Sequence, residues 1–102
     1  QNVKFASKEK LIQEIAVYGR RSAEARQVYS RLYKLLPERL SEIKRSYRGE
    51  FSASKSSRLA LCDRKYKEHI REYLDIKEES QRDRIQWETH RMYFYARKLF
   101  RF

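Results

Sequence analysis

Apolar and small residues recur along the first third of the chain at alternating steps of four and three. They are Leu11, Ile15, Tyr18, Ser22, Ala25, Tyr29, Leu32 and Leu36. This spacing places them along one face of a helix. Ser7 precedes the stripe and is a suitable N-cap. The pattern therefore predicts a helix over about residues 7–36.

Pro37 follows this stripe without ending it. A proline has no backbone N–H, so it either opens a new helix in its first turn or kinks a continuing one. Leu40, Ile43 and Tyr47 carry the apolar spacing onward, and we predict a helix over about residues 37–48. Residues 49–57 lose the helical period and are rich in small polar side chains, which predicts a loop.

Asp63 stands where an N-cap would open the last helix, predicted over about residues 63–99. Its apolar positions form two groups, separated by residues 77–84, which contain no apolar side chain. One continuous helix of roughly 55 Å accommodates this polar middle. A small core cannot cover a helix of that length, so we expect it to contact partner subunits.

The chain has only two glycines and one proline, too few for the turns of an all-β fold of 102 residues. Its length suits one domain, or one subunit that completes its core by assembly. We predict a single all-α domain over residues 1–102, a helical hairpin-like subunit that forms a homo-oligomer. The expected subunit contacts are Tyr29, Leu32, Trp87, Met92, Tyr95 and Leu99.

The charge balance favours a polyanionic partner. Lys and Arg number 25 against 14 Asp and Glu, for a formal net charge of +11. Much of the excess lies within residues 20–48, where basic side chains on a helix can follow a phosphate backbone and release its counterions. A solvated basic face is the alternative reading.

Aromatic residues make up 14% of the chain and are interleaved with the basic ones. Bases of a single strand stack on such rings while Arg and Lys hold the phosphates. Zinc-finger spacing, a basic leucine zipper and a compact helix-turn-helix are absent from the sequence, which favours sequence-neutral binding. The predicted nucleic-acid contacts are Arg20, Arg21, Arg26, Lys44, Arg45, Tyr47, Arg48, Phe51, Arg97, Lys98 and Arg101.

Signals for catalysis are weak. Cys62 is the only cysteine, which excludes an internal disulfide and a CxxC metal site and fits a reducing cytosol. His69 and His90 lie far apart and no HExxH motif is present. A Gly-rich phosphate loop is also missing. We predict no enzyme activity, metal or cofactor, and the lack of an apolar stretch of about 18 residues predicts no membrane partner.

Several features follow one another in a familiar order: a basic helical half ending in residues 45–49 (RSYRG), a polar loop, residues 59–61 (LAL), and a long helix ending in residues 96–98 (ARK). Over roughly residues 18–100 this order resembles the phage recombination-mediator family of UvsY-like proteins. The resemblance implies a homo-oligomer in the cytoplasm of a bacterial host that binds single-stranded DNA. It also implies a recombinase or a single-strand-binding protein as partner.

The same resemblance implies that Lys44, Arg45 and Arg48 contact DNA and that residues 87–99 supply subunit contacts. Two other functions stay open at this point. One is a helical adaptor whose C-terminal helix docks on a protein and whose positive charge is incidental. The other is an RNA-binding or ribosome-associated protein, which the sequence does not separate from a DNA binder.

Overall fold

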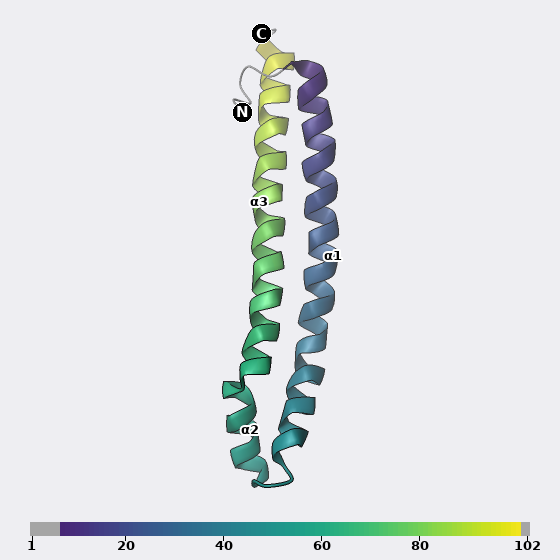
Figure 1. Ribbon diagram of the computed structural model, residues 1–102. Coiled ribbons are helices and arrows are strands. Elements are labelled where there is room, and N and C mark those ends of the chain that lie inside the picture. Colours follow the sequence, from purple (N-terminus) through teal and green to yellow (C-terminus); the bar gives the residue numbers. More distant parts are fainter. Residues whose placement is uncertain (1–6, 101–102) are drawn as a thin grey trace. The chain divides into compact units, whose positions relative to one another are not determined.

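The computed structural model describes residues 7–100, without the side chain of Phe100, and is all-α. Its three helices are α1 (Lys8–Tyr47), α2 (Ala53–Cys62) and α3 (Arg64–Phe100), shown in Figure 1. The predicted fold class is confirmed.

Both predicted N-caps are also confirmed. The Ser7 hydroxyl accepts a hydrogen bond from the backbone N–H of Lys10 at 3.1 Å, directly before α1. Asp63 Oδ1 accepts one from the N–H of Lys65 at 2.7 Å, directly before α3. Each side chain satisfies a helical N–H group that has no partner within its own helix.

Pro37 lies inside α1, so the predicted division into helices over 7–36 and 37–48 was wrong. The proline cannot bond the carbonyl four residues before it, which belongs to Tyr33. Tyr33 and Pro37 both lie on the exposed side of the helix, where water can satisfy that carbonyl. The helix therefore continues past the proline.

The predicted loop over residues 49–57 was also wrong in extent, because α2 begins at Ala53. Ser52 caps this helix, and its hydroxyl accepts a hydrogen bond from the N–H of Lys55 at 3.3 Å. The buried face of α2 consists of small residues, Ser56 and Ala60, and not of large apolar ones. A search for a stripe of large apolar side chains therefore misses the helix.

Contacts divide the chain into two units, and α1 and α3 each contribute one segment to both. The first unit combines α1 up to Arg26 with α3 from Glu78 onward. Its α1 and α3 segments pack antiparallel, and polar side chains fill much of their contact. Ser22 and Ser80 each donate a hydroxyl hydrogen bond to the other's backbone carbonyl, at 3.2 and 3.0 Å.

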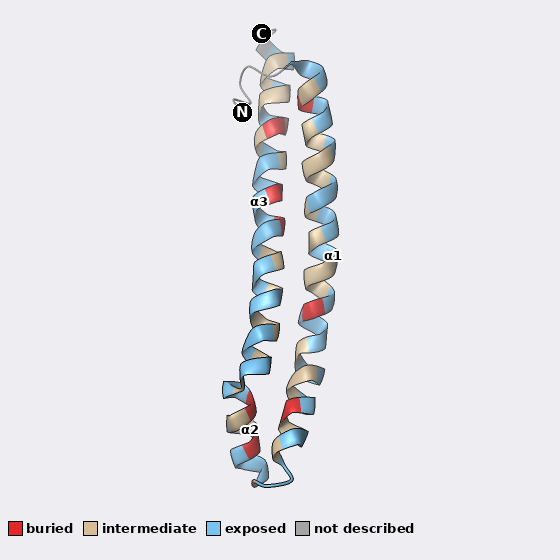
Figure 2. Ribbon diagram, viewed as in Figure 1, coloured by how far each residue is buried: buried red, intermediate tan, exposed pale blue. Residues whose placement is uncertain are grey.

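The second unit spans residues 27–77 and contains the end of α1, all of α2 and the start of α3. Leu32, Ile43 and Ala60 are buried in it. Figure 2 shows buried residues in red on α1 and α2 of this unit. The ring of Tyr73 on α3 lies 6.0 Å from that of Tyr29 and 5.5 Å from that of Tyr33, both on α1. The buried aliphatic residues and the half-buried Tyr29 and Tyr73 form a small core, and Tyr33 lies at its exposed edge.

Candidate nucleic-acid interface

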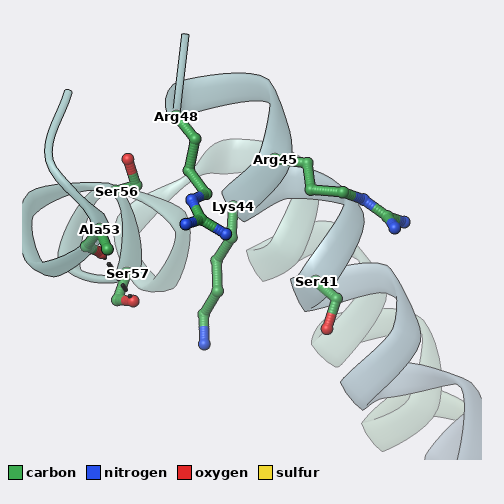
Figure 3. A pocket seen from close by; sticks show the side chains of 7 residues that line it. All are labelled: Ser41, Lys44, Arg45, Arg48, Ala53, Ser56 and Ser57. Atoms are coloured by element: carbon green, nitrogen blue, oxygen red, sulfur yellow. Dashed lines mark hydrogen bonds between the residues drawn. The ribbon is translucent and has the colours of Figure 1, made fainter. Parts of the chain in front are cut away.

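The end of α1 and the start of α2 form the walls of an open hollow of about 330 Å³ within the second unit. It is lined by Ser41, Lys44, Arg45, Arg48, Ala53, Ser56 and Ser57. We call this site the basic hollow, because its lining contains three cations and no carboxylate (Figure 3).

A tight turn places the two helices around the basic hollow. The helical hydrogen bonding of α1 extends to the N–H of Arg48, which donates to the carbonyl of Lys44 at 3.2 Å. The N–H of Phe51 then donates to the carbonyl of Tyr47 at 3.1 Å, which reverses the chain before Ser52. The last turn of α1 therefore lies beside the first turns of α2.

The three cations are not neutralised by acidic neighbours. Arg45 and Arg48 are exposed and Lys44 is half-buried. Figure 3 shows Lys44 and Arg48 extending beside α2, whereas Arg45 extends away from it. Within residues 7–100 these side chains form no ion pair, in contrast to Arg39, which lies 3.7 Å from Glu72. Their charge is available to an anion.

The serine hydroxyls of the basic hollow already donate to backbone carbonyls. Ser41 donates to Pro37 and Ser57 donates to Ala53, both at 3.0 Å. The buried Ser56 donates to Phe51 at 3.4 Å. An anion in the basic hollow would therefore accept its hydrogen bonds from the Lys and Arg side chains. The serines are small and leave space for the anion.

The two rings predicted to stack on bases have partners within the protein. The Tyr47 hydroxyl donates to Asp63 Oδ2 at 2.5 Å, and its ring lies 6.3 Å from that of Phe51. The Lys55 ammonium lies 4.7 Å from the centre of the Phe51 ring. Both rings are half-buried, so a stacking base would have to displace one of these contacts.

The hydrogen bond between Tyr47 and Asp63 changes the acidity of both groups. It is the largest cause that lowers the pKa of the Asp63 carboxyl, and the bond from the Lys65 N–H lowers this pKa further. The same contact raises the pKa of the Tyr47 hydroxyl, because ionising it would place two negative charges together. The pair therefore consists of a carboxylate and a neutral phenol at neutral pH.

The other predicted nucleic-acid contacts do not line the basic hollow. Five belong to the first unit, namely Arg20, Arg21, Arg26, Arg97 and Lys98. Arg21 lies 3.6 Å from the buried Asp83 and 5.5 Å from the centre of the Tyr18 ring. Arg101 lies outside the described residues. Sequence reasoning missed four lining residues, Ser41, Ala53, Ser56 and Ser57. Ser52 is a residue type that favours N-caps, which was a signal that α2 could begin there.

The predicted subunit contacts fall into two groups. Leu32 is buried and Tyr29 packs on Tyr73, while Trp87 packs against Gly19 within the first unit. These three residues stabilise the chain itself. The other three are exposed on α3 and are free to meet another molecule: Met92, Tyr95 and Leu99.

Both histidines have structural contacts. An Arg39 Nη1 lies 2.9 Å from His69 Nδ1, and His90 Nδ1 lies 2.6 Å from the carbonyl of Gln86. In the described part of the chain, no three His, Cys, Asp or Glu residues are grouped as a metal site would require. The described helices also include none with the length and apolar content needed to cross a bilayer.

Comparison with known proteins gives no match, whether to family models, to curated proteins or to solved structures.

Proposed function

We propose that this protein binds single-stranded DNA without sequence preference and presents the strand to a recombination partner. The observation that carries the proposal is the basic hollow, whose lining contains Lys44, Arg45 and Arg48 and no carboxylate. Lys44 and Arg48 extend beside α2, and Arg45 extends outward from the rim, where it can contact a neighbouring phosphate. A formal net charge of +11 adds long-range attraction for a polyanion. Binding releases condensed counterions from each phosphate that a cation neutralises.

A flexible strand suits the basic hollow better than a duplex. The site lies between two helix ends joined by a short turn, and a single strand can bend its phosphates into it. Duplex readers instead present a helix or ribbon that fits a groove, and the sequence contains no motif of that kind. The cations contact phosphates and not base edges, so the expected binding is sequence-neutral.

The role in recombination rests on the resemblance to UvsY-like proteins. Such a role requires a surface for another protein, either a second copy, a recombinase or a single-strand-binding protein. The exposed Met92, Tyr95 and Leu99 supply apolar side chains for such a contact. The proposal involves no covalent chemistry.

Fluorescence anisotropy with a labelled oligonucleotide tests the DNA-binding step. Three phosphate contacts predict that log affinity falls against log salt with a slope of about −2. The double substitution Arg45→Glu and Arg48→Glu should abolish most binding and flatten this slope. The matched control is Arg31→Glu with Lys34→Glu, which has the same spacing and charge change on exposed positions of α1 outside the basic hollow.

Salt-independent affinity, or equal losses in the two double variants, would contradict the proposal. Competition between DNA and RNA of equal length separates the remaining nucleic-acid alternative. DNA should displace the labelled strand at least as well as RNA does. If RNA displaces it at much lower concentration, the protein is an RNA binder.

A further inference from the structure

In the first unit, α3 carries an exposed line of apolar side chains, which we call the apolar seam. It consists of Ile85, Met92, Tyr95 and Leu99, with exposures of 59%, 68%, 48% and 76%. Their steps of seven, three and four match the a and d positions of a heptad repeat. A seam of this spacing fits a second helix laid along it.

In this unit α3 buries several polar residues and exposes several apolar ones, the reverse of an ordinary surface helix. Ser80, Asp83 and His90 are buried, while the apolar seam is exposed (Figure 2). Exposed apolar stripes and buried polar groups are the informative departures from normal burial. They indicate that the apolar seam is covered by another molecule.

A column of basic residues follows one flank of the apolar seam. Arg84, Arg91 and Lys98 each precede a seam residue by one position and repeat every seven residues. In a coiled coil these are g positions, which pair with charges on the partner helix. The opposite flank carries the uncharged Thr89 and Ala96 at the e positions.

Within the chain, Arg84 forms an ion pair with Glu88 at 3.2 Å, and the Arg91 guanidinium lies 4.5 Å from the centre of the Trp87 ring. Arg84 and Lys98 are exposed and Arg91 is half-buried, so a partner carboxylate can still reach the basic column.

We propose that the apolar seam docks an acidic amphipathic helix of another protein, whose carboxylates pair with Arg84, Arg91 and Lys98. The apolar seam of a second copy has no carboxylate at its e or g positions. Parallel pairing would place the basic column against Thr89 and Ala96, and antiparallel pairing would place it against itself. Like charges in that arrangement repel.

The apolar seam is also unsuited to a membrane surface. Interfacial helices bury a broad apolar face, whereas a line of a and d positions is narrow. Glu88 stands within the line and forms an ion pair with Arg84 at 3.2 Å. A carboxylate there opposes insertion among acyl chains, but it can remain hydrated between two helices.

This inference names the kind of partner for the surface of Met92, Tyr95 and Leu99 that the proposed function invokes, and it does not depend on the binding of DNA. The apolar seam belongs to the first unit and the basic hollow to the second, so variants can test each site by itself.

The test uses the full-length protein and two labelled synthetic peptides of equal length. Both have Ile and Leu at the a and d positions; one has Glu at e and g, and the other has Lys. Anisotropy should show at least about tenfold tighter binding of the Glu peptide. Met92→Ser should weaken it about tenfold or more, as expected for a central apolar contact, whereas Leu61→Ser, at an exposed position on α2, should not.

A charge reversal distinguishes lost charge pairing from a folding defect, because a misfolded variant would bind neither peptide. Arg84→Glu with Lys98→Glu should exchange the preference, so that the Lys peptide binds more tightly than the Glu peptide. Equal affinity for both peptides, or unchanged binding by Met92→Ser, would overturn the inference. So would a dimer in sedimentation equilibrium that Met92→Ser dissociates, or binding to phosphatidylserine vesicles that the same substitution abolishes.

Discussion

The hydroxyl of Tyr47 donates a hydrogen bond to Asp63 Oδ2 at 2.5 Å, which connects the last residue of α1 to the residue before α3. The other oxygen of the same carboxylate accepts the N–H of Lys65 and caps α3. The Asp63 side chain therefore caps the start of α3 and also binds the last residue of α1. Lys44, Arg45 and Arg48 surround Tyr47 in sequence, so this contact also steadies the wall of the basic hollow.

This pair makes stability depend on pH at both ends of the scale. The folded pKa of Asp63 lies below its ordinary value of 3.8. The stabilisation of the folded state by this carboxylate is therefore complete above pH 3.8 and is lost as pH falls through the folded pKa. The folded pKa of Tyr47 lies above its ordinary value of 10.0. The stabilisation of the folded state by this phenol is therefore complete below pH 10.0 and is lost as pH rises through the folded pKa. Urea unfolding followed by circular dichroism should show both losses.

Tyr47→Phe should lower the urea midpoint at neutral pH and reduce its drop on acidification, because the main cause of the Asp63 shift is removed. Tyr33→Phe is the control, since Tyr33 is exposed and packs only its ring on Tyr73. If the urea midpoint of both variants falls on acidification as much as that of the parent protein, the contact between Tyr47 and Asp63 does not cause this fall.

Gly19 permits close packing of Trp87. A Cβ added at Gly19 would lie 3.0 Å from both Cδ1 and Nε1 of the indole, whose face is covered by the Arg91 guanidinium at 4.5 Å. Gly19→Ala gains about 1 kcal/mol in helix propensity but incurs about 1–3 kcal/mol of overpacking. We expect net destabilisation of roughly 1 kcal/mol and a shifted emission of Trp87, the single tryptophan.

Gly49→Ala is the matched control for that substitution. No described atom lies within 4 Å of the position that its Cβ would take. The change should leave stability unaltered or raise it by about 0.4–1 kcal/mol, because alanine lowers the conformational entropy of the unfolded chain. A Gly19 variant as stable as this control would show that the indole contact does not restrict the site.

Asp83 carries a buried charge with incomplete compensation. Its Oδ1 lies 3.6 Å from the half-exposed Arg21, and its buried Oδ2 has no hydrogen-bond partner among the described residues. Arg21→Ala should therefore destabilise the protein by roughly 1–3 kcal/mol, because the carboxylate loses its cation. Asp83→Leu should be at least as stable as the parent protein. Equal losses in both variants, measured by urea unfolding, would contradict this view of the pair.

A carboxylate placed in the basic hollow should weaken DNA binding without harming the fold. Ala53 lines the basic hollow and is the first residue of α2, where an acidic side chain favours the helix N-terminus. Ala53→Glu should reduce affinity about tenfold, which corresponds to ~1.4 kcal/mol. Ser54→Glu adds the same charge one residue later, outside the lining, and should have a much smaller effect in the same anisotropy titration.

The all-α fold and the starts of both long helices follow from local signals in the sequence, whereas the continuation of α1 past Pro37 and the start of α2 at Ala53 do not. The spacing of Leu11, Ile15 and Tyr18 predicts the start of α1, and Ser7 and Asp63 act on N–H groups two or three residues away. Such interactions join residues that are neighbours along the chain, so their pattern is visible without a structure. The cations Lys44, Arg45 and Arg48 were also identified from the sequence alone.

Tertiary structure decided which side chains meet across the helices. It buried Ser80 and Asp83 against α1 while leaving Met92 exposed, the reverse of what residue polarity suggests. It also set the small residues of α2 beside Lys44 and Arg48, which created the basic hollow. These contacts join residues from different helices, and periodicity within one helix carries no information about the alignment of another. Local signals in the sequence determined where the two long helices begin, and the packing between helices determined the two surfaces.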